Sequence, residues 1–122
     1  LTRGENVEFP LKGPGRRRIP ACMLTTGKPV KGVSRCFVDS NLTGEPLRYH
    51  ISEVAGGQRS HPPHQHGGCE AVHVLEGELT LELGEAQQVL KAGEGAVFNP
   101  SQLHGLRNHS PAPVRYLVIL SA

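Results

Sequence analysis

The stretch of sequence that decides the fold is residues 64–77, which read His64-Gln65-His66-Gly67-Gly68-Cys69-Glu70-Ala71-Val72-His73-Val74-Leu75-Glu76-Gly77. His64, His66 and Glu70 share one parity, and alternate side chains of an extended strand leave on the same face. All three can therefore aim at one point if the chain stays roughly extended. Val72 and Val74 continue the alternation and are apolar, which predicts that this face points inward.

Two imidazoles and a carboxylate that converge on one point predict a metal site, because the same groups buried without a metal form a costly polar cluster. A fourth ligand should come from elsewhere in the chain, and His104 is the obvious candidate. The competing interpretation is four unrelated polar residues on loops and edges, since seven histidines in 122 residues make chance pairs possible.

The composition bounds the class of protein. A chain of 122 residues suits one domain with a modest core. Its 15 glycines and 10 prolines, without helical periodicity, favour an all-β fold with many turns. Aromatic residues make up only 4% and tryptophan is absent, which argues against a nucleic-acid platform based on base stacking. The net charge of +2 indicates no particular partner.

The cysteines and the apolar segments bear on location. Cys22, Cys36 and Cys69 are odd in number and irregular in spacing, unlike a disulfide framework, so we expect a reducing, cytoplasmic setting. The sequence has no long apolar span and no apolar segment at its start, so neither a membrane helix nor a signal peptide is expected.

Apolar runs and turn residues together predict eight short strands. Leu79, Leu81 and Leu83 alternate with polar residues, which is typical of a half-buried strand. The predicted strands cover residues 35–38, 47–54, 70–75, 78–83, 87–90, 96–98, 103–108 and 115–120. Eight strands with turns at this spacing favour a double-sheet jelly-roll barrel, or double-stranded β-helix, with little or no helix.

Residues 1–34 are predicted to form an N-terminal arm, and residues 35–122 the barrel. Proline and glycine interrupt the arm too often for a helix. Short segments such as 21–24 are expected either to form edge strands or to cross to a partner subunit. The basic run at 16–18 is interpreted as part of a solvated arm in preference to a phosphate-binding patch.

Residues 64–77 resemble the first motif of the cupin superfamily. In that motif His-x-His is followed after three or four residues by Glu and, after six more, by Gly. Here the corresponding residues are His64, His66, Glu70 and Gly77. The leading glycine of the motif is displaced, because Gly57 lies one residue upstream of the expected position, which suggests a one-residue bulge.

Residues 93–108 resemble the second cupin motif. The distance from its leading glycine to the histidine fits, and the family's His-x-x-x-Asn is matched by His104-Gly105-Leu106-Arg107-Asn108. Asn99 stands where the family usually has proline, and Ser101 where glycine is common. The resemblance covers residues 45–120.

The resemblance implies a barrel that holds one divalent metal ion through His64, His66, Glu70 and His104. Three neutral imidazoles and one carboxylate leave such an ion with net positive charge, and four protein ligands leave open positions on a six-coordinate ion. Open positions are what catalysis needs, whereas a structural site is closed. The mixed nitrogen and oxygen donors suit Fe, Mn, Ni, Co or Zn and disfavour Mg or Ca.

Other residues are assigned to the pocket or kept out of it. Tyr49, Phe98 and Leu106 are candidates for pocket walls, although core packing explains them equally well. Asn108 shares the parity of His104 and either orients a pocket side chain or caps the strand end. His50 is placed outside the pocket, because it alternates to the side opposite Tyr49.

Three further residues are expected away from the metal. His61 precedes a pair of prolines and is interpreted as an exposed loop residue, with a place at the pocket mouth as the alternative. His73 and Cys69 have the parity opposite to the ligands, so we expect both at the surface or at a subunit contact.

Two functional classes follow. The first is a metalloenzyme of dioxygenase or isomerase/lyase type, whose small oxygen-rich ligand chelates the ion at its open positions; no second inward carboxylate or lysine is evident, so no catalytic residue is assigned. The second is a non-catalytic module that senses a sugar or metabolite, with the metal as an anchor. A scaffold whose metal only stabilises the fold is a third interpretation. The resemblance and the arm predict a homodimer.

Overall fold

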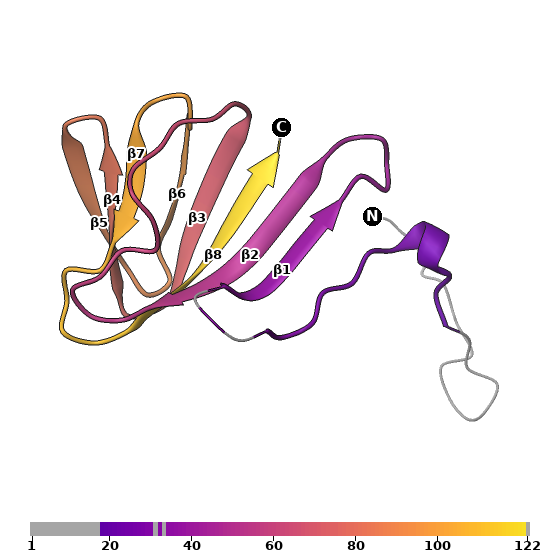
Figure 1. The fold of residues 1–122 in the computed structure, drawn as a ribbon, viewed down its shortest axis with the longest axis horizontal. Coiled ribbons are helices and arrows are strands. Elements are labelled where there is room, and N and C mark those ends of the chain that lie inside the picture. The colour runs from indigo at the N-terminus through magenta and orange to yellow at the C-terminus, as the bar shows by residue number, and fades with distance from the viewer. Residues whose placement is uncertain (1–17, 31, 33, 122) are drawn as a thin grey trace.

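The computed structural model describes residues 18–30, 32 and 34–121, and within them the backbone forms eight antiparallel strands. These are β1 Ser34–Ser40, β2 Leu47–Val54, β3 Cys69–Glu76, β4 Glu78–Leu83, β5 Ala86–Lys91, β6 Gly95–Phe98, β7 His104–Arg107 and β8 Val114–Ser121. One sheet has the order β1-β2-β8-β3-β6 and the other the order β5-β4-β7 (Figure 1). The predicted all-β jelly-roll fold is confirmed.

The strand bounds agree closely with those expected from the sequence. β2 and β4 have the predicted bounds, and the other six differ from prediction by one or two residues at an end. Alternation of apolar residues and the position of glycines and prolines therefore carry most of the local information.

The chain changes sheets at Gly77, the single residue between β3 and β4. Gly77 has a φ of 86°, and a Cβ atom at this position would lie 2.7 Å from the carbonyl oxygen of Pro113. Only glycine combines that backbone conformation with such a close approach. The glycine that ends the first motif thus has a geometric role in the fold.

The hydrophobic core is built from both sheets. Its buried side chains come from β2, β3 and β8 together with β4, β5, β6 and β7. In β3, Val72 and Val74 are buried and His73 between them is exposed, so the predicted inward face is confirmed. Burial of one such apolar side chain stabilises a fold by about 1.5–3 kcal/mol.

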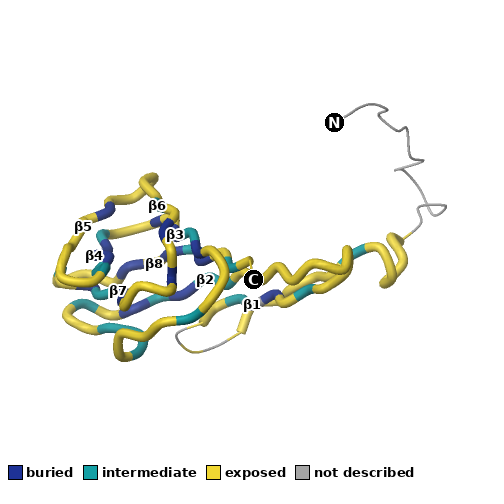
Figure 2. Tube along the Cα trace, turned by 90° about the horizontal axis from the view of Figure 1, so that it is seen from above, coloured by how far each residue is buried: buried dark blue, intermediate teal, exposed yellow. Residues whose placement is uncertain are grey.

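β1 lies at the edge of the five-stranded sheet that is remote from the three-stranded sheet (Figure 1, Figure 2). The preceding segment runs beside this edge. The amide of Val30 donates to the carbonyl of Arg35 at 2.7 Å, and the hydroxyls of Thr25 and Ser40 are 2.8 Å apart. Part of the N-terminal segment therefore covers the outermost strand of the sheet.

Residues 21–24 do not form an edge strand, which was one of the two alternatives left open by the sequence. Ala21–Met23 is a single 3-10 turn closed by a hydrogen bond from the amide of Met23 to the carbonyl of Pro20. Pro20 precedes the turn in an extended conformation, with φ −61° and ψ 149°. The edge of the sheet is bordered by the segment further along the chain, where Val30 bonds to Arg35. Residues 1–17 lie outside the described residues, and Arg16 and Arg17 with them. Among the helices described, none has the length and apolar character needed to span a membrane.

Candidate metal centre

Backbone hydrogen bonds hold the two motifs against each other. The amide of His64 donates to the carbonyl of His104 at 2.9 Å, and the amide of His104 donates to the carbonyl of His64 at 3.0 Å. The amide of His66 donates to the carbonyl of Pro100 at 2.9 Å. The loop before β3 and the loop before β7 are therefore fixed together at the site.

The first motif is not a continuous extended strand. The chain bends at Gly67 and Gly68, where Gly68 has a φ of 88°, and β3 begins only at Cys69. The premise that parity along one strand brings the ligands together is therefore wrong. His66 and Glu70 meet because the bend turns the loop back over the start of β3.

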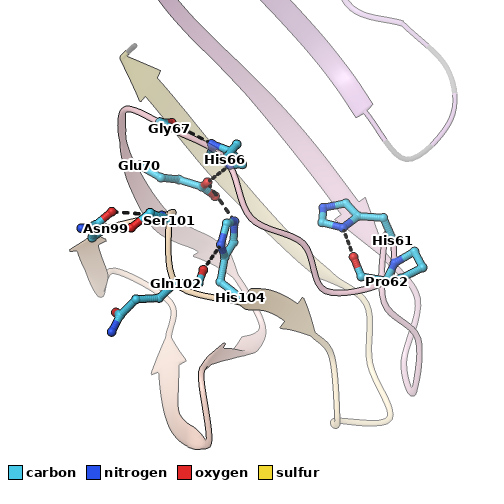
Figure 3. Close-up of polar contacts among 9 residues, drawn as sticks. All are labelled: His61, Pro62, His66, Gly67, Glu70, Asn99, Ser101, Gln102 and His104. Atoms are coloured by element: carbon cyan, nitrogen blue, oxygen red, sulfur yellow. Dashed lines mark hydrogen bonds and ion pairs between the residues drawn. The ribbon is translucent and has the colours of Figure 1, made fainter.

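Three histidines and one glutamate meet at this point, as Figure 3 shows for His66, Glu70 and His104. Ligand atoms of His64, His66 and His104 all lie within 4.8 Å of one another. An oxygen of Glu70 lies 3.0 Å from Nε2 of His66 and 3.3 Å from Nε2 of His104. Glu70 is only 5% exposed and His104 2%, so the centre is anchored in the interior.

The second ring nitrogens fix the tautomers. Nδ1 of His66 lies 2.9 Å from the carbonyl oxygen of Gly67, and Nδ1 of His104 lies 2.9 Å from that of Gln102 (Figure 3). A carbonyl only accepts, so each Nδ1 carries the proton and donates it. In the neutral rings both Nε2 atoms then direct lone pairs at the Glu70 carboxylate.

Lone pairs that face a carboxylate oxygen repel unless a cation lies between them. Nε2 of His104 is buried and has no hydrogen-bond partner among the residues that the structure describes. A proton or a metal ion relieves this arrangement, and the grouping of three imidazoles with one carboxylate is the donor set of a divalent transition metal. The residues present therefore fit a metal ion of that kind.

His64 and His61 complete the electrostatic setting. Burial, and then His61, His104 and His66, lower the pKa of His64 below its ordinary value of 6.5. The ring of His61 lies against that of His64, with centroids 4.3 Å apart. A neutral imidazole is the form that binds metal, so His64 is in its ligating form at neutral pH.

A cavity of about 710 Å³ opens beside the metal centre. His64, His66 and Glu70 line it together with His61, so His61 is a cavity residue, which favours the alternative that the sequence left open. The remaining wall comes from β1, β2, β7, β8 and the flanking loops. The site is accordingly a cluster of side chains that could hold a metal ion, in the wall of a cavity.

Of the residues proposed as pocket walls from the sequence, some line the cavity and others do not. Leu106 lines the cavity and is buried. Tyr49 does not: it is 36% exposed and lies opposite Ile119 of β8, on the outer face of the five-stranded sheet. The inner face of β2 is the one that carries His50, so the sequence-based choice between these two neighbours is corrected. His50 lines the cavity.

Phe98 and Asn108 support the site without lining the cavity. Phe98 is buried, and its ring lies 5.1 Å from that of His104 in an edge contact. Asn108 donates from Nδ2 to the carbonyls of Val54 and Ala112 and accepts from Ser110. These bonds hold the chain in place where β7 ends, so Asn108 caps the strand end and does not orient a pocket side chain.

Sequence reasoning missed the polar side chains on the β2–β8 side of the cavity. Ser52 and Tyr116 line it beside His50, and both are buried. The available signal was the alternation of His50 and Ser52 with apolar neighbours, but the apolar set was assigned to the inside. His73 and Cys69 are exposed, as their parity predicts.

Comparison with known proteins identifies the family. Residues 50–120 match the family described as Cupin_2, the cupin domain. The chain therefore belongs to the cupin superfamily, as its two motifs predicted. No protein of curated function matches it.

Solved structures share the fold. A protein of Thermus thermophilus is 25% identical with a TM-score of 0.56, covering 80% of this chain and 82% of its own. A sugar phosphate isomerase of Silicibacter pomeroyi is 22% identical with a TM-score of 0.59, covering 79% and 68%. A candidate sugar phosphate isomerase of Acidithiobacillus ferrooxidans is 25% identical with a TM-score of 0.56, covering 71% and 60%.

Proposed function

We propose that this cupin is a metal-dependent enzyme of the isomerase or lyase type that acts on a small oxygen-rich metabolite, such as a hydroxy acid, a keto acid or a sugar derivative. The observation that carries the proposal is the meeting of three imidazoles and a buried carboxylate in the wall of the cavity. A cavity of about 710 Å³ is in the range of small-molecule sites.

His64, His66, Glu70 and His104 would hold the ion, which we expect to be Fe, Mn, Ni, Co or Zn. When bound, the ion supplies Lewis acidity that polarises a carbonyl oxygen or stabilises negative charge on it. The carbonyls of Gly67 and Gln102 orient the rings of His66 and His104 for this task.

The isomerase or lyase type is preferred to a dioxygenase. Similarity to the candidate sugar phosphate isomerase, at 25% identity over 71% of the chain, supports this choice. Polar groups on the β2–β8 side of the cavity also suit a ligand rich in oxygen. A dioxygenase and a non-catalytic metabolite sensor are the alternatives that the experiment must separate.

The test starts with elemental analysis of protein purified without added metal, where we expect close to one transition metal per chain. Candidate hydroxy acids, keto acids and sugar phosphates are then incubated with the loaded protein in D₂O and followed by proton NMR. Loss or deuterium exchange of carbon-bound protons supports the proposal, provided that His104→Ala abolishes it and His73→Ala does not. Oxygen uptake at an electrode would indicate a dioxygenase, and ligand-induced thermal stabilisation without turnover a sensor.

The homodimer remains a prediction. Exposed apolar side chains cross the outer face of the five-stranded sheet, where Tyr49 pairs with Ile119 and Val97 lies further along the same row. Monomers rarely leave a contiguous apolar surface bare, which supports an association there. Light scattering at micromolar concentration should give twice the mass of one chain, and a monomer mass would contradict the prediction.

A cytoplasmic location also remains a prediction. Cys22, Cys36 and Cys69 are all unpaired, and two of them are exposed. Exposed thiols suit a reducing compartment. Fractionation of cells that express the protein, followed by thiol labelling, tests this.

A further inference from the structure

The cavity has a second polar wall besides the metal centre. We define the β2–β8 wall as His50 and Ser52 of β2, Tyr116 of β8 and Ser60 of the loop that follows β2, all of which line the cavity. Ser52 and Tyr116 are directly opposite in the β2–β8 register, so their side chains share a face. His50 precedes Ser52 by two residues and lies on that face as well.

Hydrogen bonds link these groups in a chain. Nδ1 of His50 lies 3.0 Å from Oγ of Ser52, and the hydroxyls of Ser52 and Ser60 hydrogen-bond with the phenol of Tyr116. Ser52 has one proton and two acceptor positions, so it either donates to Nδ1 of His50 or accepts from it. Either direction fixes which nitrogen of His50 carries the proton and gives Nε2 a definite role as donor or acceptor.

The members of the wall differ in access. Tyr116 is 1% exposed and Ser52 2%, so neither offers much surface to a ligand. His50 and Ser60 are only half-buried. A ligand in the cavity therefore meets His50 first, with Ser52 and Tyr116 behind it.

Charge reinforces this arrangement. Burial, then His61 and Arg48, lower the pKa of His50 below 6.5, so its ring is neutral at pH 7. Burial, with the charge of Glu70 adding to it, raises the pKa of Tyr116 above 10, although hydrogen bonds to Ser60 and Ser52 oppose the shift. The phenol therefore keeps its proton and remains a hydrogen-bond donor.

We propose that His50 is a ligand-contacting residue that binds the oxygen-rich end of a molecule whose other end reaches the metal centre, and that Ser52 and Tyr116 position its ring. This inference rests on the proposed function, because it names the second contact of the same ligand. His61 supports the joint use of both regions, since its ring lies against that of His64 and it lines the same cavity as His50. The favoured ligand class is an acid or sugar derivative with oxygens at both ends, in preference to a simple carboxylate.

The experiment compares two probes on cobalt-loaded protein by calorimetry. Acetate offers one carboxylate to the metal, whereas tartrate offers oxygens along its whole length. His50→Ala should weaken tartrate binding about tenfold, as expected for the loss of one good hydrogen bond, and change acetate binding less than about twofold. His73→Ala, on the exposed face of β3, is the matched control and should change neither. Equal effects of His50→Ala on both probes, or none, would overturn the proposal.

The positioning role has its own readout. Ser52→Ala should weaken tartrate binding about threefold and Ser52→Thr, which keeps the hydroxyl, should restore it. If both variants bind tartrate as the wild type does, Ser52 has only a packing role and that part of the proposal fails. Tartrate that binds the wild type no more tightly than acetate would overturn the two-ended ligand altogether.

A fluorescence experiment separates this proposal from the proposed function. The chain has two tyrosines and no tryptophan, so Tyr49→Phe leaves Tyr116 as its only strong fluorophore. Tartrate should change Tyr116 emission in metal-free and loaded protein, and His50→Ala should weaken that response in both. Failure of cobalt to bind would contradict only the proposed metal centre. The tartrate titration of metal-free protein would still test whether His50 contacts the ligand. An unchanged emission in the metal-free protein would overturn the role of His50.

Discussion

β2 and β3 make an instructive pair, because both strands have eight residues and both pair with β8. The inner face of β3 carries Val72 and Val74, which enter the core. The corresponding face of β2 carries His50 and Ser52, while the apolar Tyr49 lies outside. β3 forms the core with strands of the second sheet, whereas the middle of β2 borders the cavity. The difference teaches that an inward face is apolar only where another layer covers it.

The largest effect is expected in the loop that leads into β3. His66→Ala removes one imidazole from the candidate metal centre. We expect metal affinity to fall by more than about 100-fold, because even the loss of a residue that only hydrogen-bonds to a metal ligand costs about 10- to 100-fold. Its ring is partly exposed, so the fold should tolerate the change. Titration of the metal-free protein with cobalt or zinc measures the affinity.

His73→Ala is the control for this prediction, because His73 lies in β3 with its side chain on the exposed face. Its metal affinity should equal that of the wild type. Retention of full occupancy by His66→Ala would remove His66 from the ligand set.

Much of the fold was predictable because local patterns decide it. The alternation of apolar and polar residues identifies β3 and β4, and Gly77 identifies the turn between them, without reference to the rest of the chain. The spacing of His64, His66 and Glu70 likewise indicated the site. Backbone pairing of the two loops then brings these residues together with His104.

The faces of β2 could not be predicted in the same way. Which side of β2 is inside depends on where the three-stranded sheet ends, and that is a non-local property. The bend at Gly67 and Gly68 was missed for a related reason: a glycine pair permits a bend, but the contacts of the loop with the Pro100 segment determine that it occurs.

The second prediction contrasts the packing of the two strands. Val74→Ala deletes two buried methyl groups in the core, and we expect a loss of about 2 kcal/mol of unfolding free energy. Tyr49→Ala on the exposed face of β2 should cost less than about 1 kcal/mol if the protein is monomeric under the conditions used. Urea unfolding of both variants measures the difference. Equal losses would mean that the outer face of β2 is packed as tightly as the core.

The third prediction concerns acid. The pKa values of His50 and His64 are lowered in the folded state, chiefly by burial, while the unfolded chain titrates near 6.5. The unfolded state therefore binds more protons as the pH falls, so stability is full above about 6.5 and is lost below it. The urea midpoint of metal-free protein should drop between pH 7.5 and 5, with a smaller drop in His50→Gln. His64 should contribute less, because its exposed ring is screened by solvent.

The smallest effect is expected at the phenol of Tyr116, which tests whether the β2–β8 wall is as enclosed as the core beside β3. In the Tyr49→Phe variant the remaining phenol should titrate above pH 10, because burial and the charge of Glu70 disfavour the anion. Absorbance near 295 nm follows this titration. Ser52→Ala removes a hydrogen bond that lowers the pKa, so it should move the titration to higher pH still. A phenol that titrates at 10 or below in both proteins would show that solvent reaches this wall freely. Tyr116 and Ser52 would then be no more enclosed than the half-buried His50 in front of them.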